Sequence, residues 1–548
     1  MIPRSRSDAL LLAGFCTFLF FYGLAQFGLI GADEPRYAQV AREMLEHHEW
    51  ITPLLGGQPW LEKPPLYYWQ TMLSYSLFGV SDWAARLPSA IDSSLMVLAI
   101  YLFFRRFRRG VELDAALICA SCAGVIGYAR AASMDMALAA AFTIAMLGWW
   151  AWRESGKKIY LAAFYIFIAL GALAKGPVAP FLAAAGIVLY AAATREWSFV
   201  LKTAWAPGVL LFCAIALPWY LAVQMRNPEF FHVFILQHNL ARFSTDLYHH
   251  REPFWYYLPA TVLALVPWTL FVVVAGARVV RVWGSEKESV EDDLDLQFNL
   301  FTGLWLIVPV LFFSLSQSKL PGYIVPALPG GALLLADYLR QHLEDEKPEP
   351  VAKWLGVLHG LLSAGWIVPA LLIAYLVAQH RLPPGRPIFI ALGVAFVLAA
   401  GIALTLVSRL GLRMLRFVTL IPVVLTVAAA LKLGSTALDQ TLSARPLARE
   451  ISGMETHPLP LAVYRISREL EYGLTFYRNR RAIRYEFENP PAEEHLLVAP
   501  ENWQAEVVQR AAGRRVSFLG HYGPQHVDYF WISAASSNAQ VPSAPAIR

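Results

Sequence analysis

The sequence has little charge, and its four cysteines form no site. Only 16% of the 548 residues are Asp, Glu, Lys or Arg, whereas 57% are hydrophobic. One soluble core cannot hide that much hydrocarbon from water, so the chain as a whole is not a soluble protein, and the composition indicates a polytopic membrane protein. All the cysteines lie in apolar stretches, which is typical of small buried hydrophobes and not of a disulfide framework or zinc site. They are Cys16, Cys119, Cys122 and Cys213.

Other functional patterns are also missing. We find no nucleotide-binding glycine loop, no soluble-domain repeat and no metal-ligand spacing, and nothing favours nucleic acid as a partner. A divalent metal near Glu62 or at the adjacent His249 and His250 is an alternative that this spacing disfavours. We therefore expect no required metal or other cofactor.

Long apolar runs dominate the chain instead. A membrane span needs roughly 20 apolar residues, and we predict about thirteen transmembrane helices. The first follows Arg4 and Arg6 like a signal peptide but lacks a convincing cleavage site, so we expect a retained helix. The fifth and sixth, which only Lys175, Gly176 and Pro177 separate, are either a hairpin or a broken helix. The predicted spans are 9–30, 84–104, 112–129, 134–152, 159–174, 177–193, 205–224, 255–277, 298–316, 321–339, 354–378, 387–407 and 414–433.

Cations predict the orientation. With a cytoplasmic N-terminus, every inside connection is short and basic, as the Arg105–Arg106 and Arg108–Arg109 pairs illustrate. The loops 32–83 and 225–254 and the C-terminal tail then share the opposite, extracytoplasmic face.

A change in composition predicts two domains, a transmembrane domain at 1–434 and a small α/β domain at 435–548. Short strand-like stretches and helical intervals alternate after residue 435. We expect strands within 459–467, 481–487, 493–500 and 514–520, and helices within 467–479 and 502–512.

The loop after the first span carries unusually many ionisable residues. Burying charge at a membrane face costs solvation, so Asp33 and Glu34 are candidate catalytic carboxylates. Asp33 is equally typical of a helix cap, with Pro35 in the first turn. Arg36 and Tyr37 follow closely enough to share this site, on an amphipathic helix that otherwise suits the membrane surface.

The same loop ends in WLEKPPLYYW. Two prolines disfavour helix, so we expect Glu62 and Lys63 on a stiff, extended backbone, which suits a phosphate-binding lysine. A snorkelling lysine beside an aromatic belt is the alternative. Tyr67 and Tyr68 suit either a membrane-interface anchor or a sugar platform.

Further charged and polar residues fall on the same predicted face. Each alone is typical of a snorkelling or helix-end residue, but several cations around a few carboxylates suit an anionic substrate, because positive charge stabilises a phosphate leaving group. These candidates are Asp135 near Arg130, Lys175, Arg251, and Lys319 with Tyr323.

Several motifs carry a family resemblance. The runs DEPRYA at 33–38, EKPPLYYW at 62–69 and ARLPS at 85–89 resemble the lipid A 4-amino-4-deoxy-L-arabinose transferases, bacterial relatives of the protein O-mannosyltransferases. LAKGPVAP and SKLPGYIVPALPG are similar to later motifs of that family. The resemblance implies a GT-C glycosyltransferase fold in the bacterial inner membrane, with the active site and C-terminal domain in the periplasm. It also implies an undecaprenyl-phosphate sugar donor, a lipid A acceptor and resistance to polymyxin and other cationic peptides.

Residue roles carry over from the resemblance. Asp33 becomes the base or the acceptor-positioning carboxylate, Lys63 with Arg36 the ligand of the carrier phosphate, and Glu62, Tyr37 and Tyr323 site-shaping partners. We predict an inverting, metal-independent displacement at the anomeric carbon. The alternatives are transfer of mannose or an aminohexose to protein or another glycolipid, and a lipid-carrier flippase. A flippase should have inverted repeats with paired broken helices, which we do not find in the sequence.

Overall fold

The protein folds into two compact units. One, the membrane unit, comprises residues 1–25, 44–54 and 58–434; the other, the α/β unit, comprises 26–43, 55–57 and 435–548. The predicted active-site loop is thus divided between them. The computed structural model describes residues 4–241, 252–285, 293–344, 358–360, 397, 401, 415–511 and 513–535.

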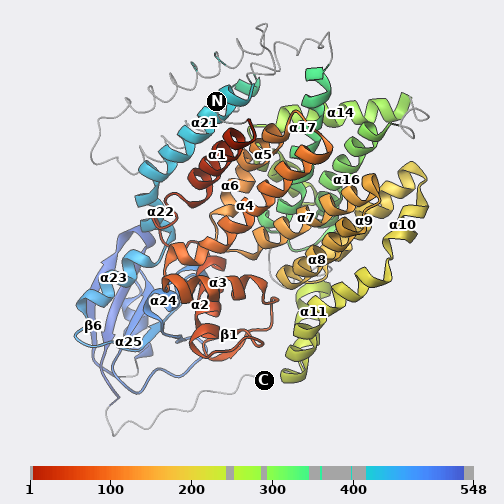
Figure 1. Cartoon of the computed structure of the whole chain (residues 1–548). Helices are drawn as coiled ribbons and strands as arrows, with labels where there is room; N and C mark the ends of the chain where they lie inside the picture. The colour runs from red at the N-terminus through yellow and green to blue at the C-terminus, as the bar shows by residue number, and fades with distance from the viewer. Residues whose placement is uncertain are drawn as a thin grey trace. The chain divides into compact units, whose positions relative to one another are not determined.

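The membrane unit is a bundle of apolar helices (Figure 1). Within the described residues, six helices are long and apolar enough to cross a membrane, or up to nine if each bent pair is one span. The predicted spans 354–378 and 387–407 lie almost wholly outside the described residues, so the count of thirteen stays a prediction. The helices are α1 (Arg4–Cys16), α3 (Leu66–Phe78), α4 (Asp82–Phe107), α5 (Glu112–Ser121), α6 (Ala123–Ala129), α7 (Met134–Ser155), α8 (Lys158–Lys175), α9 (Val178–Thr194), α10 (Trp197–Thr203), α11 (Ala206–Arg226), α13 (Tyr257–Ala264), α14 (Thr269–Ser285), α16 (Leu294–Leu315), α17 (Leu328–Glu344) and α21 (Leu415–Ala429).

Several predicted spans are interrupted. The first ends at Phe21, after the π-helical turn η1 (Thr17–Phe21), and Gly23 follows with φ of 73°. The predicted span 112–129 is bent by 68° between α5 and α6, and 255–277 is bent by 115° between α13 and α14. Pro267 lies in the second break, where its missing N–H cannot continue a helix. The sequence analysis placed spans at these three stretches but did not predict the breaks within them.

Aromatic rings fill the interior of the membrane unit. Trp149 and Trp150 of α7 are fully buried and contact Phe301 of α16, with ring centroids 5.4 and 4.9 Å apart. Large rings in contact fill the space between the helices, and a void there would lose dispersion contacts. These ring contacts hold α7 and α16 together.

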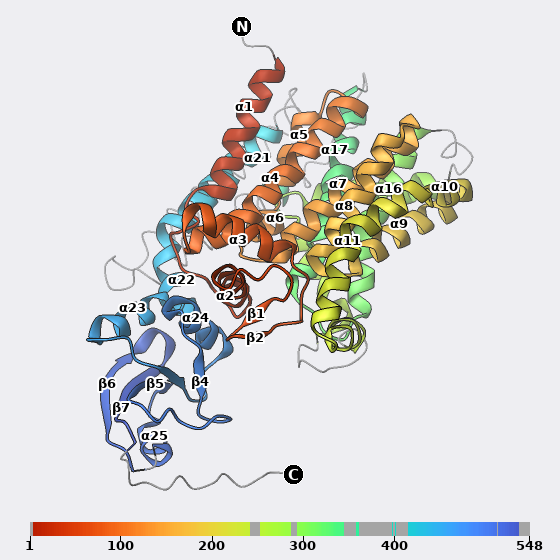
Figure 2. The same ribbon diagram turned by 60° about the horizontal axis from the view of Figure 1, so that its bottom comes forward.

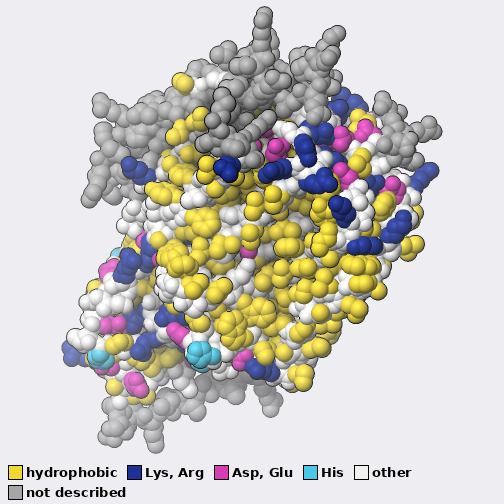
Figure 3. Space-filling view, viewed as in Figure 1, with side chains coloured by type: hydrophobic (Ala, Val, Ile, Leu, Met, Phe, Trp, Pro, Cys, Tyr) yellow, Lys and Arg dark blue, Asp and Glu magenta, His cyan; other side chains and the backbone are white. Residues whose placement is uncertain are grey.

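The outer surface of this bundle is hydrophobic. Leu95, Leu98 and Leu102 of α4 are exposed, and hydrophobic side chains cover the middle of the face drawn in Figure 3. Arg105 and Arg106 are exposed at the C-terminal end of α4, where basic side chains gather. An apolar surface bounded by cations fits a multi-pass membrane protein.

The α/β unit has a five-stranded mixed sheet in the order β4-β3-β5-β7-β6. Strand β3 pairs in parallel with β4 and β5, and β7 pairs antiparallel with β5 and β6. The predicted small α/β domain is confirmed, although β7, α22 and α23 were not predicted. The elements are α2 (Asp33–Glu46, to Glu43 in this unit), α22 (Ser435–Leu442), α23 (Arg445–Met454), β3 (Leu461–Val463), α24 (Arg468–Arg478), β4 (Ala482–Arg484), β5 (His495–Pro500), α25 (Gln504–Arg510), β6 (Val516–Tyr522) and β7 (Val527–Ile532).

The two faces of this sheet are covered by different helices. Leu461 and Val463 of β3 belong to a core with Leu474 of α24, whereas Ala462 belongs to a second core with Val507 of α25. Side chains alternate along a strand, so both faces need cover. The sheet is the middle layer of three.

Candidate functional site

Asp135 is the centre of a charged cluster in the membrane unit. Ser133 caps α7: its hydroxyl accepts from the Asp135 backbone N–H at 3.2 Å and donates to Asp135 Oδ2 at 2.6 Å. Lys175, the last residue of α8, forms an ion pair with the other carboxylate oxygen. A partly buried charge needs such partners, and this pair joins α7 to α8.

A third segment, which contains Gly322 and Tyr323, packs against the same carboxylate. The ring centroid of Tyr323, in the 3-10 helix η4 (Pro321–Ala327), lies 4.4 Å from the Lys175 ammonium. A Cβ added to Gly322 would lie 2.7 Å from Asp135 Oδ2, so only glycine lets this backbone approach. Lys63 also lies near enough to act electrostatically on Asp135. Lys63, Asp135, Lys175 and Tyr323 are named the Asp135 cluster below.

Lys319 lies four residues before Tyr323, in a fixed loop. Only 6% of it is exposed, and its ammonium donates to the Ser316 carbonyl. The Tyr257 hydroxyl donates to the Leu320 carbonyl and accepts from the Leu320 N–H, both at 3.0 Å. These hydrogen bonds hold the loop that supplies both Lys319 and Tyr323.

Glu62 and Lys63 lie on a curved backbone. Glu62 is in a turn and Lys63 at a bend, so the predicted extended stretch is wrong; the two prolines delay helix α3 until Leu66. The Glu62 carboxylate lies 3.8 Å from Nε2 of the buried His238. This contact brings the segment after α11 to the candidate phosphate-binding turn.

Tyr67 and Tyr68 are fully buried in α3. The Tyr67 hydroxyl donates to the Ala85 carbonyl of α4 at 2.8 Å. Arg86, also buried, donates to the Leu24 carbonyl at 2.9 Å. These contacts hold α3 against α4 and α4 against the chain that follows the first helix. Contact of either tyrosine with substrate stays a prediction.

Glu49 is a charged group of this loop that the sequence did not single out. It accepts from the backbone N–H of Ile51 at 2.8 Å and of Thr52 at 3.1 Å, and pairs with Arg226 of α11. Burial alone would raise its pKa, but these donors and the guanidinium together lower the pKa below its usual value. The loop is thereby fastened to α11.

The other half of the predicted site lies in the α/β unit. Helix α2 begins at Asp33, with Pro35 in its first turn. The side chain of Asp33 is 49% exposed and pairs with Arg36, which also contacts Tyr37. Glu34 is 6% exposed and accepts from the Ile30 N–H at 2.9 Å. Glu34 therefore makes the backbone hydrogen bond at this helix end, and Asp33 offers a carboxylate to solvent.

Convergence of Asp33 with Lys63 stays a prediction, because the two belong to different units. Arg251, His249 and His250 lie outside the described residues. Within the described part of the chain, no group of three or more His, Cys, Asp or Glu side chains is arranged to hold a metal. The expectation of metal independence therefore also remains untested.

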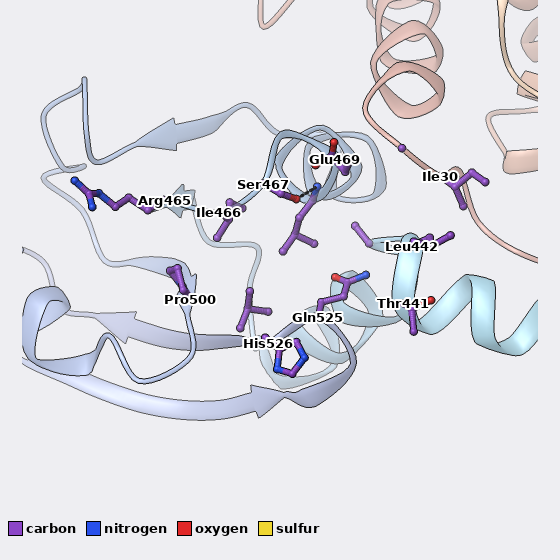
Figure 4. A pocket seen from close by; sticks show the side chains of 14 residues that line it. Ile30, Thr441, Leu442, Arg465, Ile466, Ser467, Glu469, Pro500, Gln525 and His526 are labelled. Carbon is purple, nitrogen blue, oxygen red and sulfur yellow. Dashed lines mark hydrogen bonds between the residues drawn. The ribbon is translucent and has the colours of Figure 1, made fainter. Parts of the chain in front are cut away.

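A pocket of about 650 Å³ in the α/β unit was missed by sequence reasoning. Figure 4 shows Gln525 between Ser467, the cap of α24, and His526. The Gln525 amide donates to the Ser443 carbonyl at 2.8 Å, while its buried oxygen has no hydrogen-bond partner in the described structure. The lining comes from segments distant in sequence, so no local motif marks it.

Comparison with known proteins decides the family. Residues 9–234 match the family model for dolichyl-phosphate-mannose-protein mannosyltransferases. An undecaprenyl phosphate-alpha-4-amino-4-deoxy-L-arabinose arabinosyl transferase from Aeromonas salmonicida is 30% identical over 89% of this chain and 90% of its own length. The chain belongs to this arabinosyl transferase family. An Enterobacter relative of the same name is 29% identical over 75% of this chain and 72% of its own.

The fold of the arabinosyl transferase family is also present. A crystal structure of ArnT from Cupriavidus metallidurans bound to undecaprenyl phosphate matches with a TM-score of 0.75 and 22% identity, covering 95% of this chain and 97% of that one. The GT-C fold predicted from the first-loop motifs is confirmed, and so is the family resemblance.

Proposed function

We propose that this protein is a glycosyltransferase that moves 4-amino-4-deoxy-L-arabinose from undecaprenyl phosphate to lipid A phosphates. The observation that carries the proposal is 30% identity to an arabinosyl transferase of that name along nearly the whole of both chains. The reaction takes place at the periplasmic face of the bacterial inner membrane. Covering lipid A phosphates with an amino sugar lowers their negative charge and gives resistance to polymyxin.

The Asp135 cluster supports a role in holding the donor. Undecaprenyl phosphate leaves as an anion, and cations fixed in a partly dry site stabilise that developing charge. Lys63 is the proposed ligand of the carrier phosphate. Asp135 and Tyr323 hold the Lys175 ammonium, and Lys319 comes from the loop that supplies Tyr323.

Asp33 is the proposed carboxylate on the acceptor side. A phosphomonoester with a second pKa of about 6 is mostly ionised at neutral pH, so a lipid A phosphate needs no base to attack the anomeric carbon. The half-exposed Asp33 then orients the acceptor or stabilises the positive sugar ring, with Arg36 fixing its position. The displacement is inverting: the sugar–oxygen bond to the carrier phosphate breaks as the acceptor phosphate bonds from the opposite face.

Reconstitution with labelled undecaprenyl-phosphate aminoarabinose and lipid A tests the proposal. The expected product is lipid A heavier by one pentosamine per modified phosphate, measured by mass spectrometry. Parallel assays with mannose and aminohexose donors should give no product. Movement of the intact donor across the bilayer without transfer would instead identify a flippase, and transfer to protein would identify another acceptor class.

A further inference from the structure

The chain just before α2 is tied to the C-terminal part of the α/β unit. The Gly28 N–H donates to Asp439 at 2.8 Å, and the Leu29 N–H donates to the Tyr477 hydroxyl at 2.6 Å. A Cβ on Gly28 would lie 2.2 Å from Ser443 Oγ, so no side chain fits at this position. The approach to the candidate catalytic helix is therefore set by residues more than 400 positions away.

Helix α2 itself lies next to α24, as Figures 1 and 2 both show. Arg42 donates to the Phe476 carbonyl at 3.3 Å, and Gln39 donates to Asn479 at 3.4 Å. Both partners lie at the C-terminal end of α24. Contacts one turn apart on α2 fix the rotation of the helix and hence the direction of its first-turn side chains.

Arg36 contacts both α24 and the candidate catalytic residue Asp33. Its guanidinium carbon lies 5.1 Å from the ring centroid of Tyr37 and 5.5 Å from that of Tyr472 of α24. Arg36 also holds Asp33. A planar guanidinium in contact with two rings keeps one orientation, and arginine suits such stacking far better than lysine.

We propose that Tyr472 is a positioning residue for the carrier phosphate and that the C-terminal part of the chain is the scaffold of the active-site helix. The inference rests on the proposed function, in which Arg36 with Lys63 binds that phosphate. Ring contact orders the Arg36 side chain before ligand arrives, so less rotamer entropy is lost on binding. A contact of this kind changes an equilibrium constant by about 3- to 30-fold.

The test measures binding of undecaprenyl phosphate to the full-length protein in nanodiscs. Tyr472→Leu should weaken binding about 3- to 10-fold, whereas Tyr472→Phe, which keeps the ring, should stay within about twofold of wild type. Trp503→Leu is the matched control, because its ring lies 5.4 Å from Arg465 in the same unit. That variant should retain wild-type affinity.

The same substitution in a protein that lacks Arg36 distinguishes a positioning role of Tyr472 from a general loss of structure. In Arg36→Gln protein, Tyr472→Leu should cause no further loss of affinity. The inference is overturned if Tyr472→Leu binds like wild type, or if its loss persists without Arg36. Wild-type protein that binds the carrier phosphate but transfers no sugar would contradict the proposed function and leave the positioning role standing.

Discussion

The two units hold their candidate site residues in opposite ways. In the membrane unit, Lys175 is paired with Asp135, and Lys319 is buried against a carbonyl. In the α/β unit, Asp33 is half exposed, and Arg36 contacts the rings of Tyr37 and Tyr472. An apolar surrounding forces every charge to find a partner inside the protein, whereas a solvated helix end does not. The charges of Asp135 and Lys175 therefore contribute to stability, whereas the charge of Asp33 contributes little to it.

The largest effect should come from breaking the pair in the membrane unit. Asp135→Ala leaves the Lys175 ammonium without its carboxylate in a partly dry site, which should destabilise the protein by about 3–5 kcal/mol. Unfolding followed by tryptophan fluorescence measures this change. Combining Asp135→Leu with Lys175→Met should restore most of the stability but not sugar transfer. Equal stability of Asp135→Ala and wild type would remove the contrast between the units.

The corresponding change in the α/β unit should affect activity alone. Asp33→Ala should lower sugar transfer about 10- to 100-fold with little change in unfolding, because the carboxylate is half exposed. Asp33→Asn keeps an oxygen that can orient an acceptor and should lose less. Kinetics with the lipid A acceptor measure both variants. Activity of Asp33→Ala within twofold of wild type would remove Asp33 from the mechanism.

A neutral hydrogen bond gives a smaller expected effect. Tyr67→Phe removes the hydroxyl that donates to the Ala85 carbonyl and should cost about 1 kcal/mol of stability. Transfer should be unchanged if Tyr67 only packs α3 on α4. A specific rise in the KM for the donor, with stability intact, would instead make Tyr67 a substrate contact.

The smallest effect that we expect is a change in stability with pH, caused by protonation of His495 in the α/β unit. Burial, with a further contribution from Arg514, lowers the pKa of His495, although the Glu493 carbonyl opposes the shift. Unfolded His495 binds a proton below about pH 6.5, so stability should fall as the pH drops from 6.5 through the lowered native pKa. His495→Gln should flatten this dependence. A pH profile of His495→Gln identical to that of wild type would contradict this assignment.

Local patterns predicted some features and not others. The cations of LAKGP and SKLPGY were recognisable because charge in an apolar run is costly, and the structure brings Lys175 and Tyr323 together. Four of the five strands of the α/β unit, β3 to β6, were predicted from the sequence, and β7 was not. The attachment of α2 to α24 was not predictable, since it depends on Arg42 and Phe476, which have no local signature. The pocket at Gln525 depends equally on tertiary packing.

The central claim is that the Asp135 cluster holds the carrier phosphate through Lys63. The most direct measurement is the dissociation constant of undecaprenyl phosphate for wild-type protein and Lys63→Ala in nanodiscs. Lys158→Ala is the matched control. Lys158 lies at the opposite end of α8 from Lys175, and its ammonium is 5.5 Å from the centroid of the Trp152 ring. We predict at least about tenfold weaker binding for Lys63→Ala and no change for Lys158→Ala. Equal affinity of wild type and Lys63→Ala would contradict the account.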